Sequence, residues 1–185
     1  MIKVIAFDLV GVLAFEKDIK LTIEEEKLER MFGPNKNDDD YLKKAKEIIQ
    51  NDTITIKTTK EIINKLYQVY DKNIFKKLKK NNPNIKLIIA TNHLSYVKDY
   101  IIKSFDTKYL DDVLISAEIH KIKPNSNFYQ YILDKYNIIP EELLFIDDNQ
   151  ENINSADSME IHTIKKNKDD NLFEKIVCYL NGIGD

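Results

Sequence analysis

The chain has 185 residues, which is enough for one well-buried core and a small added subdomain but too few for two full catalytic domains. Its 28 basic and 31 acidic side chains give a net charge of -3, so there is no basic field for nucleic acid and a small-molecule partner is expected. No apolar stretch reaches the ~18 residues of a membrane span, and the first residues do not resemble a signal peptide. We therefore expect a cytoplasmic protein.

The first predicted strand covers residues 2–7, an apolar run that ends at Asp8. Roughly 70 residues separate it from the next strand, whereas an ordinary connection has ~10 to 15, so a folded insertion is expected. Helical periodicity appears at residues 23–32, 41–49 and 61–70, with N-cap residues offered at 38–40 and 58–59. We predict a small all-helical cap over residues 16–75, inserted after the first strand, where it would cover the ligand crevice.

The rest of the chain alternates between helices and strands. A basic run at residues 76–80 predicts a solvated helix face, and apolar runs rich in β-branched residues predict four more strands, at 86–90, 113–116, 143–146 and 161–164. Helical patterns follow these strands at 94–105, 127–136, 149–158 and 171–180. The last one contains Cys178, which its apolar neighbours predict to be a buried, inert thiol.

Strands that alternate with helices predict a buried parallel sheet covered on both faces. The expected fold class is α/β, a three-layer Rossmannoid parallel sheet. Its core would comprise residues 1–15 and 76–185.

Polar residues follow four of the five predicted strands, and a parallel sheet would bring them together at one edge. They are Asp8, Thr91 with Asn92, Lys121 with Lys123, and Asp147 with Asp148. Each has a purely structural alternative. Asp8 would end a turn, Thr91 and Asn92 would cap a helix near Ser95, the lysines would be solvated, and the acidic pair would cap a helix near Asn149.

These segments resemble the four motifs of the haloacid dehalogenase-like (HAD) hydrolases in order and spacing. FDLVGVL, IIATN, KIKP and FIDDNQENINSA stand where that superfamily shows D-x-D-G-(T/V)-L, (S/T)-N, K-P and DD-x-x-x-N-x-x-x-A. The match covers nearly all of the chain except the cap. It implies a phosphatase-type HAD hydrolase with a small helical cap.

The resemblance implies a role for each motif in phosphoryl transfer. Asp8 would attack phosphorus and form an aspartyl-phosphate. Thr91 and Asn92 would bind the phosphoryl oxygens through a hydroxyl and backbone N–H groups. Lys123, which precedes Pro124 as in the family pattern, would hold the two anions together, with Lys121 as the alternative.

The same resemblance implies a Mg²⁺ cofactor. Carboxylate and carbonyl oxygens suit this hard cation. Its expected ligands are Asp8, the backbone carbonyl of Val10, Asp147 and Asp148. Asn152 would orient Lys123 or a metal ligand.

The chain departs from the family pattern at Val10, where the phosphatases usually carry an aspartate that protonates the leaving alcohol and then activates water. The loss of such a group adds roughly 3 to 5 kcal/mol to a barrier. Glu16, Asp18 and Glu118 are candidate substitutes.

Three functions follow from this departure. The first is a Mg²⁺-dependent phosphomonoester hydrolase, weak or with a displaced acid, acting on a small phosphorylated metabolite. The second is a catalytically impaired protein that binds a phosphorylated ligand or partner. The third is a 2-haloacid dehalogenase, because halide leaves without protonation. We expect His93 and His120 to be surface imidazoles rather than site residues.

Overall fold

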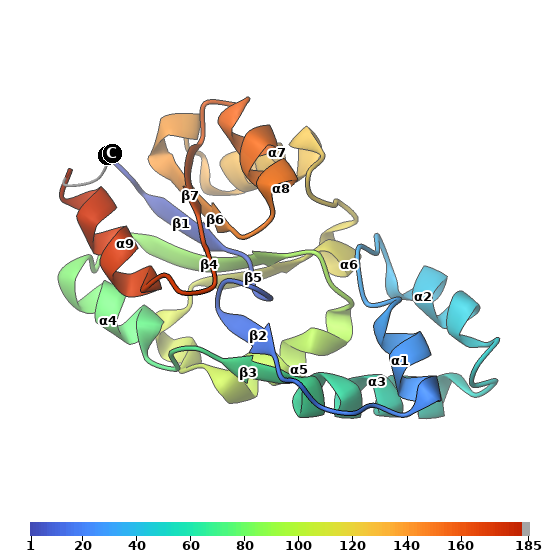
Figure 1. The fold of residues 1–185 in the computed structure, drawn as a ribbon. Coiled ribbons are helices and arrows are strands. Elements are labelled where there is room, and N and C mark those ends of the chain that lie inside the picture. Colours follow the sequence, from blue (N-terminus) through green and yellow to red (C-terminus); the bar gives the residue numbers. More distant parts are fainter. Residues whose placement is uncertain (183–185) are drawn as a thin grey trace.

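The computed structural model describes residues 1–182, and its centre is a five-stranded parallel sheet (Figure 1). The strand order is β5-β4-β1-β6-β7. The strands are β1 (Val4–Phe7), β4 (Lys86–Thr91), β5 (Asp112–Ile115), β6 (Leu143–Asp147) and β7 (His162–Lys165). This sheet confirms the predicted α/β class, and its order places β1 between β4 and β6, the strands that carry the motifs of Thr91 with Asn92 and of Asp147 with Asp148 at their carboxyl ends.

Helices cover both faces of the sheet (Figure 1). Val4 and Ala6 share one core cluster with α7 and α8, whereas Ile5 and Phe7 share the other with α4, α5 and α9. The alternation follows from the two-residue period of a strand. The helices are α4 (Ile74–Asn81), α5 (Lys98–Ser104), α7 (Ser126–Tyr136), α8 (Gln150–Asp157) and α9 (Leu172–Leu180).

Four short helices complete the connections: η1 (Ser95–Val97), η2 (Thr107–Tyr109), α6 (Ser116–Ile119) and η3 (Pro140–Glu142). The predicted strand at 113–116 therefore ends one residue early, because Ser116 begins α6. Within residues 1–182, no helix is long and apolar enough to cross a membrane.

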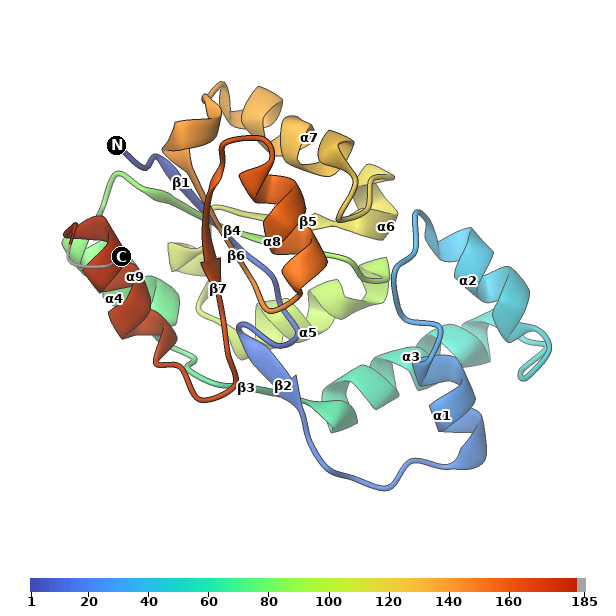
Figure 2. The same cartoon turned by 45° about the horizontal axis from the view of Figure 1, so that its top comes forward.

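Three helices lie together beyond the carboxyl edge of the sheet (Figure 2). They are α1 (Ile23–Glu29), α2 (Asp38–Ala45) and α3 (Asp52–Leu66). We refer to residues 17–66, which contain them, as the helical insertion. The first of these helices begins at Ile23, as predicted, but the N-caps predicted for the other two were wrong. The α2 cap is Asn37, and α3 begins after Asn51, whose side chain accepts the Ile54 N–H at 3.1 Å, so Thr58 and Thr59 lie inside this helix.

A short antiparallel hairpin joins the helical insertion to the core. Its strands are β2 (Ala14–Glu16) and β3 (Tyr67–Val69), with Glu16 opposite Tyr67 and Ala14 opposite Val69. The third predicted insertion helix, at 61–70, therefore stops at Leu66, where the chain turns into β3. Strands of three residues carry too little periodicity to be recognised in the sequence.

Hydrogen bonds hold the helical insertion against the core. The Asp38 carboxylate at the start of α2 accepts the Ser95 N–H at 2.9 Å. The Ser116 hydroxyl donates to the Asn35 carbonyl at 2.7 Å, and His120 Nδ1 donates to the Lys36 carbonyl at 2.7 Å. Residues 35–38 are thereby tied to the loops that follow β4 and β5.

Cys178 is exposed on α9, so its prediction as a buried thiol was wrong. The helix buries Leu172 and Ile176. Cys178 lies two residues beyond Ile176, which on an α-helix places it about 200° around the axis, on the opposite side. The basic run at 76–80 lies on α4, where Leu78 is buried and the lysines flank it, as predicted.

Candidate active site

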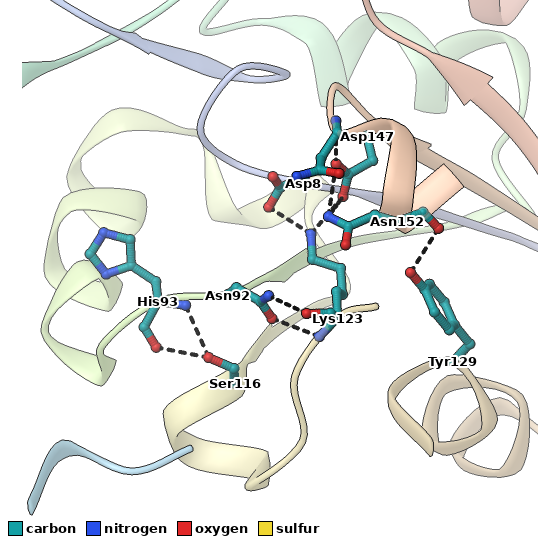
Figure 3. A network of polar contacts seen from close by, with 9 residues as sticks. Asp8, Asn92, His93, Ser116, Lys123, Tyr129, Asp147 and Asn152 are labelled. Atoms are coloured by element: carbon teal, nitrogen blue, oxygen red, sulfur yellow. Dashed lines mark hydrogen bonds and ion pairs between the residues drawn. The ribbon is translucent and has the colours of Figure 1, made fainter. Parts of the chain in front are cut away.

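The predicted motif residues Asp8, Lys123 and Asp147 meet at the carboxyl edge of the sheet (Figure 3). Asp8 follows β1 and Asp147 ends β6; these strands are paired, with Phe7 next to Ile146. The Lys123 ammonium lies between the two carboxylates, 2.9 Å from Asp8 Oδ1 and 2.7 Å from Asp147 Oδ2. Its side chain is 1% exposed, so one buried cation faces two anions.

Asn92 fixes the loop that carries Lys123 (Figure 3). Its side-chain amide donates to the Lys123 carbonyl at 2.8 Å, and its side-chain oxygen accepts the Lys123 N–H at 2.9 Å. The side chain of Asn92 is thus committed to the backbone of Lys123. Phosphate binding by this residue, as predicted, would use its backbone N–H group.

Asp147 is held by the start of α8. The Asn152 amide lies 3.1 Å from each of its carboxylate oxygens, and the Asn149 N–H donates to Oδ1 at 2.9 Å. These neutral donors orient the carboxylate and stabilise its charge. Asn152 therefore contacts an expected metal ligand, which was one of its two predicted roles.

Asp8, Asp147 and Asp148 each offer a carboxylate oxygen, and these atoms lie within 4.8 Å of one another. Gly11 makes room for Asp148: at φ +88, an added Cβ would lie 2.2 Å from Asp148 Oδ2. Three carboxylates around one point are the donor set that a small hard cation such as Mg²⁺ requires. The residues present therefore fit the expected cofactor.

Burial and neighbouring charges compete in this cluster. Burial raises the pKa of Asp8 to about 6, although Lys123 lowers it. Burial and the neighbouring Asp147 also raise the pKa of Asp148. For Lys123, burial alone would lower the pKa, but attraction by Asp8 and Asp147 outweighs it and raises the pKa. The lysine thus stays charged and offsets part of the carboxylate repulsion.

A cleft of about 500 Å³ opens beside the carboxylates. Val10, Gly11 and Asp148 line its core side, and Phe15, Glu16 and Tyr70 line its hairpin side. Residues 165–168 complete the wall. We call this space the Val10 cleft. The position at which the family usually carries its acid therefore faces an open space large enough for a small ligand.

His93 is buried, with 3% exposure, so the predicted surface location was wrong. Phe32 of the helical insertion and Tyr67 of β3 pack against its ring. Nδ1 accepts the Leu94 N–H at 2.8 Å, so the proton of the neutral ring is on Nε2, which lies 3.0 Å from the Tyr67 hydroxyl. Burial lowers the His93 pKa to about 4, which keeps the ring neutral.

The other predicted residues lie as follows. Lys121 points away from the carboxylates, with its ammonium 5.1 Å from the centre of the Tyr131 ring, so Lys123 is the lysine of the cluster. Thr91 ends β4 and is buried, and His120 is exposed as expected.

Ser116 was missed by sequence analysis. Its hydroxyl oxygen accepts the His93 N–H at 3.0 Å and links this loop to the helical insertion. Its position directly after a strand was the available signal.

Solved structures with the same fold include several hydrolases. A predicted HAD-like family hydrolase from Porphyromonas gingivalis has 22% identity and a TM-score of 0.76, with 97% of this chain and 98% of that chain covered. A HAD family enzyme from Bacteroides thetaiotaomicron, in complex with magnesium and inorganic phosphate, has 17% identity and a TM-score of 0.72, covering 92% of this chain and 97% of that one.

A predicted phosphoglycolate phosphatase from Haemophilus somnus has 18% identity and a TM-score of 0.65, with coverage of 89% and 84%. At these identities the structures establish a shared fold. A comparison with curated protein sequences gives no match. The sequence model of the family described as haloacid dehalogenase-like hydrolase matches residues 5–166, and the chain therefore belongs to that family.

Proposed function

We propose that the protein is a Mg²⁺-dependent phosphomonoester hydrolase that acts on a small phosphorylated metabolite through an aspartyl-phosphate on Asp8. The observation that carries this proposal is the buried Lys123 ammonium between the Asp8 and Asp147 carboxylates, with Asp148 close by. An ammonium in this place keeps an anionic nucleophile and an anionic phosphate in contact.

The charge of the cluster supports the proposal of a divalent cation at this site. Three carboxylates and one ammonium leave two formal negative charges. A dianionic phosphate would be repelled, and a bound Mg²⁺ would supply the missing positive charge and polarise the phosphoryl oxygens. Asp8, Asp147, Asp148 and the Val10 carbonyl would hold it. The magnesium and phosphate bound to the Bacteroides thetaiotaomicron enzyme support this assignment.

The residues of the site divide the chemistry among them. Asp8 attacks phosphorus while Lys123 balances the charge that develops on the phosphoryl group. The Thr91 hydroxyl and the Asn92 N–H bind the phosphoryl oxygens. Asn92 also fixes the Lys123 loop, so the ammonium is in position before the substrate arrives.

The cap predicted over residues 16–75 would limit the size of the substrate. Its helices lie beyond the carboxyl edge of the sheet (Figure 2), the edge at which Asp8 follows β1 and Asp147 ends β6. The Val10 cleft, of about 500 Å³, has room for a small organic group. A phosphorylated metabolite therefore fits better than a phosphoprotein.

The test is a screen with Mg²⁺ over sugar phosphates, nucleotides and aryl phosphates, using wild type and Asp8→Asn. The variant keeps the size of the side chain but removes the nucleophilic carboxylate. We expect turnover by wild type, at least 100-fold less by Asp8→Asn, and loss of activity in EDTA that Mg²⁺ restores. Equal turnover by the two proteins across the panel would refute the proposed function.

Val10 favours a second candidate, a dehalogenase, because halide departs without a proton. Turnover of 2-haloacids in the presence of EDTA would select it. If wild type hydrolyses neither class, while Val10→Asp gains phosphatase activity, the protein is a phosphate-binding descendant of the enzymes. The three carboxylates within 4.8 Å favour the phosphatase over the dehalogenase, because a carbon–halogen hydrolysis has no need of a cation site.

A further inference from the structure

We infer that Glu16, the last residue of β2, is the general acid and base of this site, in place of the carboxyl group that residue 10 lacks. This inference rests on the proposed phosphatase function. It assigns to one carboxylate the two proton transfers of phosphomonoester hydrolysis.

The first support is the place of Glu16 in the Val10 cleft. Glu16, Val10 and Asp148 line the same space, so Glu16 lies beside the region where an acid at residue 10 would work. Glu16 is exposed and, among residues 1–182, its carboxylate takes part in no ion pair or hydrogen bond. It is free to reach a bound substrate.

The second support is the register of the hairpin. Glu16 lies opposite Tyr67, and side chains of such a pair project from the same face. The Tyr67 hydroxyl contacts His93, next to the Asn92 that holds Lys123. Burial raises the pKa of Tyr67, and the negative charges of Glu16, Glu29 and Asp8 raise it further. The Tyr67 hydroxyl thus connects the hairpin that carries Glu16 to the loop that holds Lys123.

The other candidate carboxylates are committed or misplaced. Glu118 pairs with Lys98 at 2.9 Å. Asp18 lies beyond the end of β2 and does not line the Val10 cleft. Asp148 belongs to the carboxylate cluster and would be occupied by the cation. Glu16 is the remaining carboxylate of the cleft.

The proposed steps balance in protons and bonds. As the Asp8 oxygen bonds to phosphorus, the bond from phosphorus to the leaving oxygen breaks, and the Glu16 carboxyl proton passes to that oxygen to give the alcohol. Glu16, now a carboxylate, then takes a proton from water while the water oxygen bonds to phosphorus. The bond to Asp8 breaks, phosphate leaves, and both side chains return to their starting states.

The experiment compares wild type, Glu16→Gln and Asp18→Asn, with Mg²⁺ present, on an alkyl phosphate and on 4-nitrophenyl phosphate. We expect Glu16→Gln to lower kcat on the alkyl phosphate by about 10² to 10⁴, the range of general acid–base catalysis. Asp18→Asn, which carries the same kind of change outside the cleft, is expected to keep kcat within about twofold of wild type.

The aryl substrate separates proton transfer from folding or binding. Nitrophenolate leaves without a proton, so Glu16→Gln should still release a burst of about one equivalent and then turn over slowly, because water activation is lost. Unchanged steady turnover in Glu16→Gln would overturn the inference, and so would loss of the burst. If either result is found while the activity of wild type still depends on Asp8, the proposed phosphatase function is unaffected and only the role of Glu16 is refuted.

The pH profile gives a further readout. In a plot of kcat against pH, Glu16→Gln should remove the limb that, in wild type, reports the protonated form of the Glu16 carboxyl group. The titratable groups around Glu16 are Tyr67 of β3, Glu29 of α1, Asp148 after β6, and Lys165, Lys166 and Lys168 of β7 and its following loop. A limb that persists unchanged in the variant would contradict the inference.

Discussion

Lys123→Met removes the ammonium between Asp8 and Asp147 while keeping a long apolar side chain. At an effective dielectric constant of about 20, unit charges about 3 Å apart attract each other by roughly 5 to 6 kcal/mol, and the two contacts at 2.9 and 2.7 Å are of this kind. Relief of the lysine's desolvation offsets much of that loss. We expect the free energy of unfolding at pH 7.5 to fall by about 3 to 5 kcal/mol, as when one partner of a buried pair is removed.

The loss should depend on pH in a defined direction. With Lys123 present, the pKa of Asp8 is already raised from 3.8 to about 6 by burial. Without the lysine it rises further, so the folded protein holds a proton that the unfolded chain has released. A carboxyl group whose pKa is higher in the folded than in the unfolded state stabilises the folded protein at pH values below the unfolded-state pKa. This stabilisation is lost as the pH rises through the folded-state pKa. The free energies of unfolding of the variant and wild type should therefore differ least near pH 4.5.

Urea unfolding of wild type and Lys123→Met at pH 4.5, 6 and 7.5 measures the effect. Lys98→Met is the matched control, because Lys98 pairs with Glu118 at 2.9 Å on the surface and should contribute less than about 1 kcal/mol. A deficit below about 1 kcal/mol at pH 7.5, or one that does not shrink on acidification, would refute the view that Lys123 compensates two buried carboxylates.

Three further predictions concern His93, Gly11 and Cys178. Burial lowers the pKa of His93 from 6.5 to about 4, so the unfolded chain takes up a proton here at a higher pH than the folded protein does. The free energy of unfolding should therefore fall by about 3 kcal/mol as the pH drops from above 6.5 to 4. Urea titrations of His93→Gln should lack this dependence on pH. Gly11→Ala should displace Asp148 and weaken Mg²⁺ binding in calorimetry at least tenfold, whereas Gly182→Ala, at φ +68 with nothing within 4 Å, tests backbone strain alone and should leave binding unchanged. Cys178 is exposed, so one thiol per native chain should react rapidly with a disulfide reagent, and protection until denaturant is added would contradict the structure.

The parts of the fold that follow a local rule could be predicted from the sequence. Each core strand is an apolar run, and a polar residue after the run marks the edge where ligands bind in parallel sheets. Asp8 and Asp147 were therefore expected to meet, and the pairing of β1 with β6 brings them together. The family resemblance added the preference for Lys123 over Lys121, and the two lysines indeed point to different places.

The parts that depend on distant residues could not be predicted. The β2–β3 hairpin pairs Ala14–Glu16 with a strand on the far side of the helical insertion, and no local pattern encodes that partner. His93 is buried because Phe32 and Tyr67 cover it, although its own neighbours in the sequence are those of a surface turn. The Asn92 side chain binds the Lys123 backbone rather than a ligand, a choice that only the loop's position in space decides.

The site also separates its chemistry between two parts of the chain. Asp8, Lys123 and Asp147 are fixed by the sheet and by the neutral amides of Asn92 and Asn152. If Glu16 moves the protons, that step depends instead on the hairpin at the root of the helical insertion, since β2 leads directly into it. A shift of the insertion would then move the acid while leaving the nucleophile in place. Phosphate binding and leaving-group protonation would respond separately to whatever occupies the Val10 cleft, so a poorly fitting substrate would bind without being cleaved.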